Sequence, residues 1–477
     1  MNKTYGVCLG LLALGLVGLG APTSRAGERL AAGEAGGGSE TAAASAAGPS
    51  SAPTAPSAAD LRQRVEALKA ELADLNAELA AEKDGDSTAS TTAPQDQSTP
   101  APATPAQAPA SAPAAAAPMP LPSPTMSGPL ATAIPHEISA GPFGKVQVTG
   151  ILSGMGWTEG DHVSGDMPTH VDVSNAQVFV QKTSGWFQFY LQGGAYNIPA
   201  LGTAWTGTVD TVKGLFGPLP TGYLKLVKGN FNVEVGELPT LIGAEYTFDF
   251  ENMNIERGLL WNQENAISRG IQLNDTYKKL TLAFSWNDGF YSNKYNWLTG
   301  SAAWAFNSSN TLSFVGGGNF NGNARGTIAT PLLQNNSMIF NLIYTYTHGN
   351  WIVSPYFQYT GVPKNANIGI AAGSHTDGGA ILLNYAFKHG FNLAVRPEYI
   401  KSSGSVLDPN AINLLYGPGT GAFSFTLTPT YIKDGFFARA DFSIVHATNT
   451  TASFSVFGPD GTKTNQPRGA IEVGFMF

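Results

Sequence analysis

The chain ends on the stretch AIEVGFMF, residues 470–477, in which an apolar pattern runs to the last residue. Side chains of an extended strand alternate between two faces. One face would therefore carry Ile471, Val473, Phe475 and Phe477, and Glu472 would lie on the other. Most soluble domains end in frayed, polar residues, whereas a face made of large apolar side chains suits contact with lipid. This stretch predicts a terminal membrane strand.

The first 26 residues have the pattern of a secretory signal peptide. A short basic head is followed by an apolar run and by the small-residue cleavage pattern Ser24-Arg25-Ala26. The apolar run is too short for a good transmembrane helix. The only cysteine, Cys8, lies within it, so we expect a mature chain without disulfides or thiol chemistry. The net charge of −8 disfavours a nucleic-acid partner.

Two segments of low complexity follow the signal peptide. Residues 27–60 and 84–141 consist mainly of Ala, Pro, Ser, Thr and Gly, with almost no large apolar side chains. Such compositions predict disordered or polyproline-like linkers. At about 3.1 Å per residue, the second linker could extend on the order of 100 Å. We therefore expect it to separate the region before it from the region after it.

A helix is predicted between these linkers, over residues 61–83. Its apolar residues alternate in steps of four and three, as in a coiled-coil seam: Leu61, Val65, Leu68, Leu72, Leu75 and Leu79. The seam covers only about three heptads, the lower limit for this pattern. A self-associating coil is favoured, and a single amphipathic helix that docks elsewhere is the alternative.

Residues 142–477 show strand patterns throughout, and no run in them reaches the 18 apolar residues of a membrane-spanning helix. Period-two patterns predict sixteen strands, the first over about Phe143–Ser153. They begin near residues 143, 170, 185, 222, 231, 266, 280, 298, 311, 336, 351, 377, 391, 421, 435 and 468. Seven short segments with tight-turn residues alternate with eight long connections. This layout predicts an all-β fold, a transmembrane antiparallel up-and-down barrel with both termini in the periplasm.

The two faces of the predicted strands differ in polarity as a barrel wall requires. In residues 281–286 and 423–428, large apolar side chains take one parity and small polar side chains take the other. The polar parity of two later strands carries charge, which a wide barrel would place in its lumen: Arg396, Glu398, Arg439 and Asp441. One exception is Arg269, which falls on the same face of its strand as apolar neighbours. Either it lies at the membrane rim, or it follows a β-bulge near Gly270, or the predicted register of this strand is wrong. A soluble β-sandwich is the alternative fold.

The sequence favours no catalytic, cofactor or metal site. Patterns of metalloproteases, hydrolases and nucleotide-binding proteins are absent from it. The one local cluster that could supply an acid–histidine pair or metal ligands is Asp161, His162, Asp166 and His170. Solvated loop polarity is the favoured interpretation of this cluster. We therefore expect a protein that is not an enzyme.

Residues 254–301 resemble the OmpL-like family of bacterial β-barrel porins. The resemblance rests on the segments RGLLWNQ (257–263), SRGIQ (268–272) and WNDGFYS (286–292). The final GFMF is similar to the aromatic signature that outer-membrane proteins present to the barrel-assembly machinery, which would make Phe475 and Phe477 an assembly signal. The resemblance implies an outer-membrane porin in contact with lipid, with homo-trimers as the expected oligomer. The N-terminal extension is similar to those of porins with a periplasmic coiled coil.

The resemblance also implies that the long connection over residues 238–265 folds into the pore. This segment carries five carboxylates against one guanidinium: Glu245, Asp249, Glu251, Glu256 and Glu264 against Arg257. Carboxylates at a narrow point raise the local cation concentration, which predicts mild cation preference. Arg257 would either set up a transverse field or form a structural ion pair with Glu256. In the alternative placement, the loop lies across the outer rim, where salt screens its charge.

We therefore expect an outer-membrane channel for passive diffusion of small hydrophilic solutes or ions. The alternative is a structural protein that tethers the outer membrane to peptidoglycan through its N-terminal region. An outer-membrane enzyme is a weaker third hypothesis.

Overall fold

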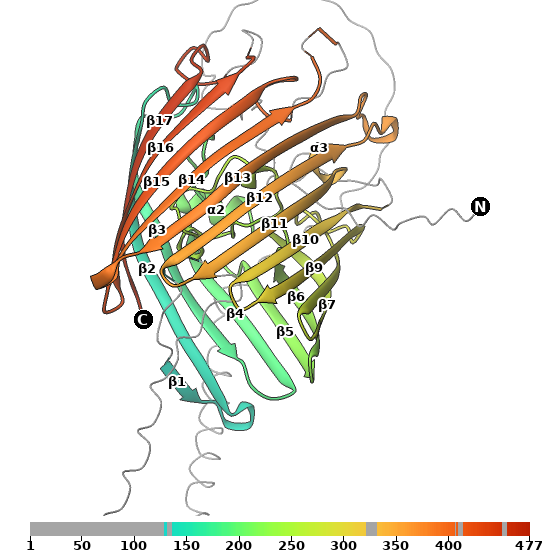
Figure 1. The fold of residues 1–477 in the computed structure, drawn as a ribbon, viewed down its shortest axis with the longest axis vertical. Helices are drawn as coiled ribbons and strands as arrows, with labels where there is room; N and C mark the ends of the chain where they lie inside the picture. Colours follow the sequence, from blue (N-terminus) through green and yellow to red (C-terminus); the bar gives the residue numbers. More distant parts are fainter. Residues whose placement is uncertain (1–127, 131–135, 321–331, 406, 409–413, 451–455) are drawn as a thin grey trace, which may run out of the picture. The chain divides into compact units, whose positions relative to one another are not determined.

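The computed structural model describes residues 128–130, 136–320, 332–405, 407–408, 414–450 and 456–477. The predicted signal peptide, the helix over 61–83 and most of both linkers lie outside these residues. The described chain is dominated by sixteen tilted antiparallel strands that form one closed barrel (Figure 1). No helix in this part of the chain is long and apolar enough to cross a membrane.

The strands follow the sixteen predicted positions in order. They are β2 (Lys145–Glu159), β3 (Thr169–Lys182), β4 (Phe187–Tyr196), β5 (Thr221–Lys228), β6 (Phe231–Pro239), β7 (Ile267–Tyr277), β8 (Leu280–Asn287), β9 (Trp297–Asn307), β10 (Asn310–Asn319), β11 (Met338–His348), β12 (Trp351–Val362), β13 (Ser374–Ala386), β14 (Phe391–Ser402), β15 (Gly421–Lys433), β16 (Phe436–Thr448) and β17 (Asn465–Met476). Each pairs with its sequence neighbours, and β17 returns to pair with β2. The closed sheet confirms the barrel and excludes the sandwich.

Short helical segments lie in the connections. They are η1 (Gly141–Phe143), α2 (Thr208–Gly214), η2 (Asp249–Glu251), η3 (Trp261–Gln263), α3 (Leu332–Asn335), η4 (Ala366–Ile368) and η5 (Lys388–Gly390). All seven short turns join strands at one end of the barrel, which we call the short-turn end. With an even number of strands, β2 starts and β17 finishes at this same end.

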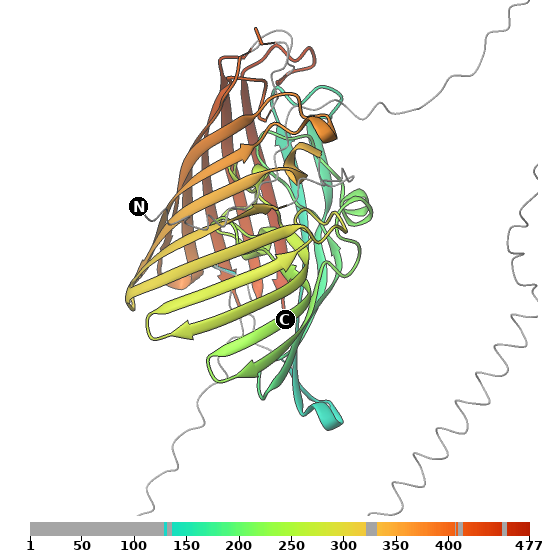
Figure 2. The same ribbon diagram turned by 90° about the vertical axis from the view of Figure 1, so that its right-hand side faces the viewer.

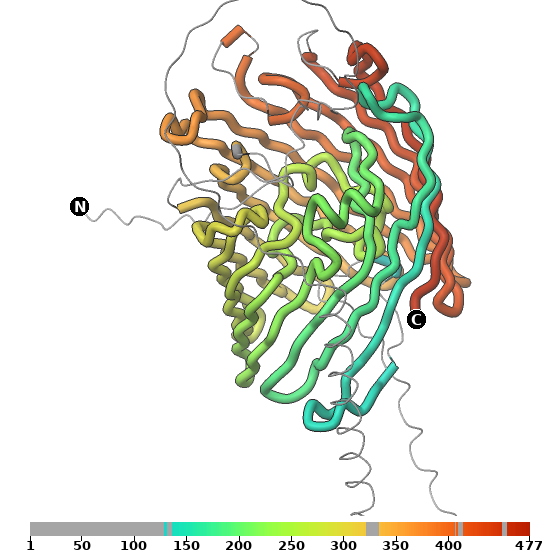
Figure 3. Tube along the Cα trace, turned by 180° about the vertical axis from the view of Figure 1, so that it is seen from behind, coloured from blue at the N-terminus to red at the C-terminus, as the bar shows by residue number. Residues whose placement is uncertain are grey.

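The last strand closes the barrel against the first, and the two run side by side in Figure 3. The N–H group of Phe477 donates to the carbonyl of Gly150 at 3.0 Å, and that of Gly150 donates back at 2.8 Å. A side chain at Gly150 would overlap the ring of Phe477. Ile471 is 61% exposed and Glu472 is fully buried, so the predicted alternation of the terminal strand is confirmed.

Other parts of the wall follow the same alternation. Leu282, Phe284 and Trp286 point outward, whereas Ser285 is buried in the interior. Arg269 is the third residue of β7 and lies at the end opposite the short turns, where it pairs with Asp288 at 2.8 Å. The register of β7 continues through this point without a shift. Of the three explanations for Arg269, the rim position is therefore the correct one.

β2 continues further than its sequence pattern indicates. We expected this strand to end near Ser153, but it extends to Glu159 and leaves a shorter connection, residues 160–168. The reason is an inverted polarity in its second half. Met155 and Trp157 face the interior, where they are only 2% and 3% exposed, and Gly154 is exposed. A rule that places large apolar side chains on the lipid side fails for such a segment.

The part of the chain that the structure describes begins within the segment that composition assigns to the second linker. Strand β1 (His136–Ser139) pairs with the first residues of β2 and extends past the short-turn end of the barrel (Figures 1 and 2). Residues 128–130 lie against the interior of the barrel, where Leu130 is 1% exposed. This end of the linker is therefore part of the barrel structure.

Candidate pore constriction

The connection between β6 and β7, residues 240–266, folds into the barrel, and we call it the inner loop. Its backbone and side chains contact inward-facing residues of β14, β15, β16 and β17, which lie far away in the sequence. All six charged residues predicted for the constriction are at most 2% exposed. The structure therefore favours the inward placement of this loop over a position on the outer rim.

The inner loop also stabilises its own turns. The N–H group of Phe248 donates to the carboxylate of Glu251 at 3.0 Å, at the start of η2. The side-chain amide of Asn252 donates to the carbonyls of Tyr246 and Phe248 at 2.8 and 2.7 Å. Because the backbone polar groups find partners within the loop, the segment can be buried without regular secondary structure.

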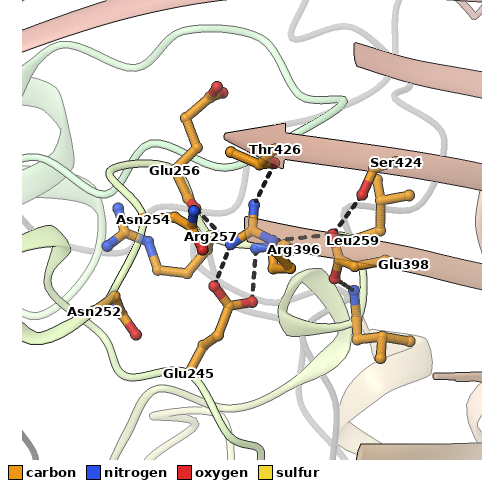
Figure 4. A network of polar contacts seen from close by, with 12 residues as sticks. Glu245, Asn252, Asn254, Glu256, Arg257, Leu259, Arg396, Glu398, Ser424 and Thr426 are labelled. Atoms are coloured by element: carbon orange, nitrogen blue, oxygen red, sulfur yellow. Dashed lines mark hydrogen bonds and ion pairs between the residues drawn. The ribbon is translucent and has the colours of Figure 1, made fainter. Parts of the chain in front are cut away.

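Arg396 on β14 makes the first set of contacts between wall and loop (Figure 4). Its guanidinium pairs with Glu245 and donates to the carbonyl of Glu256 at 2.7 Å. The same guanidinium lies 3.3 Å from Glu398, which also accepts a hydrogen bond from the N–H group of Leu259 at 3.1 Å. Charged side chains of the wall thus bind both side chains and backbone of the loop.

Arg439 on β16 makes the second set of contacts between the wall and the inner loop. It pairs with Glu472 on β17 and donates to the loop carbonyls of Asp249 and Asn252, each at 3.3 Å. The carboxylate of Asp249 accepts a hydrogen bond from the side chain of Asn175 on β3 at 2.7 Å. The loop is therefore connected to both sides of the seam at which the barrel closes.

Glu256 lies at the centre of a third set of contacts. Its carboxylate pairs with Arg468 of β17 at 3.0 Å and accepts a hydrogen bond from Ser443 at 2.8 Å. Its backbone N–H group donates to Asp441 at 2.9 Å. Arg468 pairs at the same time with Glu159 at the end of β2. Glu256 is therefore neutralised by the wall, rather than by its neighbour in the sequence.

Arg257 does not form the ion pair considered from the sequence. Its guanidinium donates twice to the carbonyl of Pro199, at 3.1 and 2.9 Å, and lies 5.8 Å from the ring of Trp261. Among the described residues, no carboxylate forms an ion pair with it. The ion pair between Glu256 and Arg257 is therefore wrong, because Glu256 pairs with Arg468 of the wall and Arg257 binds the carbonyl of Pro199.

Glu264 differs from the other acidic residues of the loop. Its carboxylate is fully buried against the backbone of Gly243, and within the described part of the chain neither oxygen has a hydrogen-bond donor. Burial, together with the negative charges of Glu245 and Glu398, raises its pKa well above the ordinary value. This loop residue therefore favours the protonated form.

The wall residues predicted for the lumen all face inward. Arg396, Glu398, Arg439 and Asp441 are at most 4% exposed. Three further wall residues of the network were missed, namely Glu159, Arg468 and Glu472. Glu472 was already placed on the inward parity of the last strand, and the same parity could have identified Arg468.

The cluster of Asp161, His162, Asp166 and His170 is only partly brought together. The Nε2 atom of His170 lies 3.0 Å from Asp166, and its ring stacks on Trp205 at 5.0 Å. His162 instead contacts the carbonyl of Val163. Among the described residues, no group of three or more His, Cys, Asp or Glu side chains could hold a metal ion. Asp166 also accepts a hydrogen bond from the N–H group of Trp205, which favours a structural role.

The barrel region is similar to a known family and to solved structures. The model of a family described as putative beta-barrel porin-2, OmpL-like, matches residues 145–477. An anion-selective porin from Comamonas acidovorans is 12% identical, with a TM-score of 0.49 over 70% of this chain and 99% of that one. OmpF of Salmonella typhi, in complex with daunomycin, is 11% identical, with a TM-score of 0.48 over 72% and 100%. No curated protein sequence matches significantly.

Proposed function

Because the chain belongs to the OmpL-like family of β-barrel porins, we propose that it forms an outer-membrane channel for passive diffusion of small hydrophilic solutes or ions, with mild cation preference. The observation that carries this proposal is the inner loop, which lies inside a closed sixteen-stranded barrel and brings five carboxylates with it. Barrels of this size enclose enough space for an aqueous channel. A loop in that space narrows the path, and its buried carboxylates act on a passing solute through their electric field.

The balance of charge around the inner loop supports the cation preference. The network contains four buried arginines, Arg257, Arg396, Arg439 and Arg468. It contains nine buried carboxylates, Glu159, Glu245, Asp249, Glu251, Glu256, Glu264, Glu398, Asp441 and Glu472. Low-dielectric walls strengthen the field of the surplus acid and attract cations.

Two effects keep the expected preference mild. Ion pairs with the wall neutralise part of the acid, as at Glu245 and Glu256. Burial also raises the pKa of Asp249 to about 8, mainly by removing water from the carboxylate. At neutral pH, the loop therefore carries less negative charge than its formal count.

Zero-current potentials across a salt gradient in planar bilayers test the proposal. The variant E245Q/D249N/E251Q removes three loop carboxylates, and the control D275N/D434N/D460N removes three exposed ones. We expect cation preference in the wild type, weaker preference in the loop variant and no change in the control. The absence of any current would contradict the channel. An anion-selective wild type, or an unchanged loop variant, would place these carboxylates outside the conducting path.

The proposal extends to the surroundings of the barrel. We place the N-terminal extension in the periplasm and propose a homo-trimer, assembled by the barrel-assembly machinery through Phe475 and Phe477. The alternative function, a tether to peptidoglycan, concerns residues 27–141. Its test is pull-down of that segment on purified peptidoglycan, compared with the full chain. Binding by the full chain that is lost when this segment is deleted would favour the tether.

A further inference from the structure

Residues 128–130 occupy the interior of the barrel although they precede its first strand. The N–H group of Gly128 donates to the carbonyl of Glu251 on the inner loop at 3.1 Å. Leu130, two residues later, is 1% exposed. A segment that composition assigns to a solvated linker is therefore bound to the loop that narrows the pore.

Leu130 lies in an apolar cluster of the barrel interior. Leu130 belongs to one contiguous buried cluster with Phe179 of β3, Phe250 of the inner loop, Phe437 of β16 and Met476 of β17. Phe437 is the second residue of β16, and Met476 is the last residue of β17. These two residues place that part of the cluster at the short-turn end.

The fit at Gly128 is close. A side chain at this residue would overlap the backbone carbonyl of Asn252, so the position requires glycine. The same carbonyl accepts a hydrogen bond from Arg439 at 3.3 Å. The segment therefore packs directly against the part of the inner loop that the wall holds in place.

Strand β1 keeps the segment close to its binding surface. Residues 136–139 pair with residues 145–148 at the start of β2, and Lys145 and Glu137 form an exposed ion pair at 2.6 Å. A ligand attached this near to its site binds as an intramolecular partner at high effective concentration. The chain thus supplies its own ligand for the apolar surface.

We propose that residues 128–130 are a docked plug that narrows the short-turn side of the channel, and that their release widens it. The occupant of the apolar surface is this segment of the same chain. The proposal rests on the channel function proposed above. It predicts two separable properties, protection of Leu130 inside the barrel and a larger conductance when docking is weakened.

Cysteine labelling tests docking without any measurement of current. The only cysteine of the chain lies in the predicted signal peptide, so L130C and I138C each introduce a single thiol into the mature protein. Ile138 lies on β1 and is 53% exposed. Because burial of a leucine side chain favours the docked state, we expect a polar maleimide to label L130C at least roughly tenfold more slowly than I138C. Equal rates in folded barrels would overturn the docking.

Single-channel conductance tests the effect of docking on the pore. L130N places an amide in the apolar cluster, G128V introduces the overlap with Asn252, and I138N is the matched control outside the barrel. We expect larger conductance in L130N and G128V and wild-type conductance in I138N. Protection of L130C together with unchanged conductance in both variants would overturn the plug. A wild type without conductance would contradict the channel, and the labelling result would still decide the docking.

Discussion

The barrel wall and the inner loop bury their charged residues by different means. On β17, exposure alternates from 61% at Ile471 to none at Glu472, as the contrast between lipid and interior requires. The inner loop has no such period, and its carboxylates are buried together regardless of their spacing. Its position depends on specific contacts with Arg396, Arg439 and Arg468. The contrast between lipid and interior determines which residues of the wall are buried, whereas individual polar partners determine the position of the inner loop.

The largest expected effect concerns the wall, at the residue where it closes. Deletion of Phe477 removes two backbone hydrogen bonds to Gly150 and the ring that packs on it. It also shortens the apolar face that resembles the assembly signature. We expect most of the assembled barrel to be lost from the outer membrane, with secretion into the periplasm intact. Fractionation followed by heat-modifiability on gels measures both quantities.

F477W is the control for this deletion, because it keeps the chain length and an aromatic ring. We expect it to assemble near wild-type levels. Normal surface levels of the deletion variant would show that neither the closing hydrogen bonds nor the terminal ring limits assembly.

The second-largest effect is expected from substitution of Arg439, which links the wall to the inner loop. R439M leaves the carboxylate of Glu472 buried without its partner and removes two donors to the loop. Loss of one member of a buried ion pair costs about 3–5 kcal/mol. We expect a decrease of this size in the free energy of unfolding, measured by urea denaturation in lipid vesicles.

The double variant R439M/E472M separates charge from packing. Replacement of both members by apolar groups removes the unpaired charge, and we expect it to recover most of the stability. If R439M alone unfolded like the wild type, the ion pair would be solvated rather than buried. The contacts of the loop with Arg396 and Arg468 would then be sufficient to hold it.

The sequence could predict the wall because one physical rule governs nearly all of it. Alternation of large apolar and small polar side chains identified all sixteen strands and the inward direction of Arg396 and Asp441. The rule failed at Met155 and Trp157, where large apolar side chains face inward. The direction of such side chains depends on local packing inside the barrel, and the alternation pattern carries no information about that packing.

The sequence could predict which charged residues of the loop belong to the candidate site, but not which residues they pair with. The acidic surplus of the loop is visible in the sequence, and the inward fold followed from resemblance. The partner of Glu256 is Arg468, which is 212 positions away and reaches it only because β17 closes the barrel. Docking of Leu130 also depends on this three-dimensional arrangement, since nothing in a Pro/Ala-rich segment marks one leucine as buried.

The smallest expected effect distinguishes a loop carboxylate without a partner from those held by the wall. Burial raises the pKa of Glu264 well above 4.5. The folded protein therefore binds this proton more tightly than the unfolded chain does, and the stability gained from it is lost as the pH rises above 4.5. E264Q has nearly the same shape and cannot lose a proton. We expect the free energy of unfolding of E264Q, relative to that of the wild type, to increase by on the order of 1 kcal/mol between pH 4 and 8. Thermal unfolding measures this difference. The other buried acids contribute equally to the pH dependence of both proteins, so they cancel in the difference. The exposed control D275N should show no such trend. A difference between E264Q and the wild type that stays constant with pH would mean that burial does not raise the pKa of Glu264.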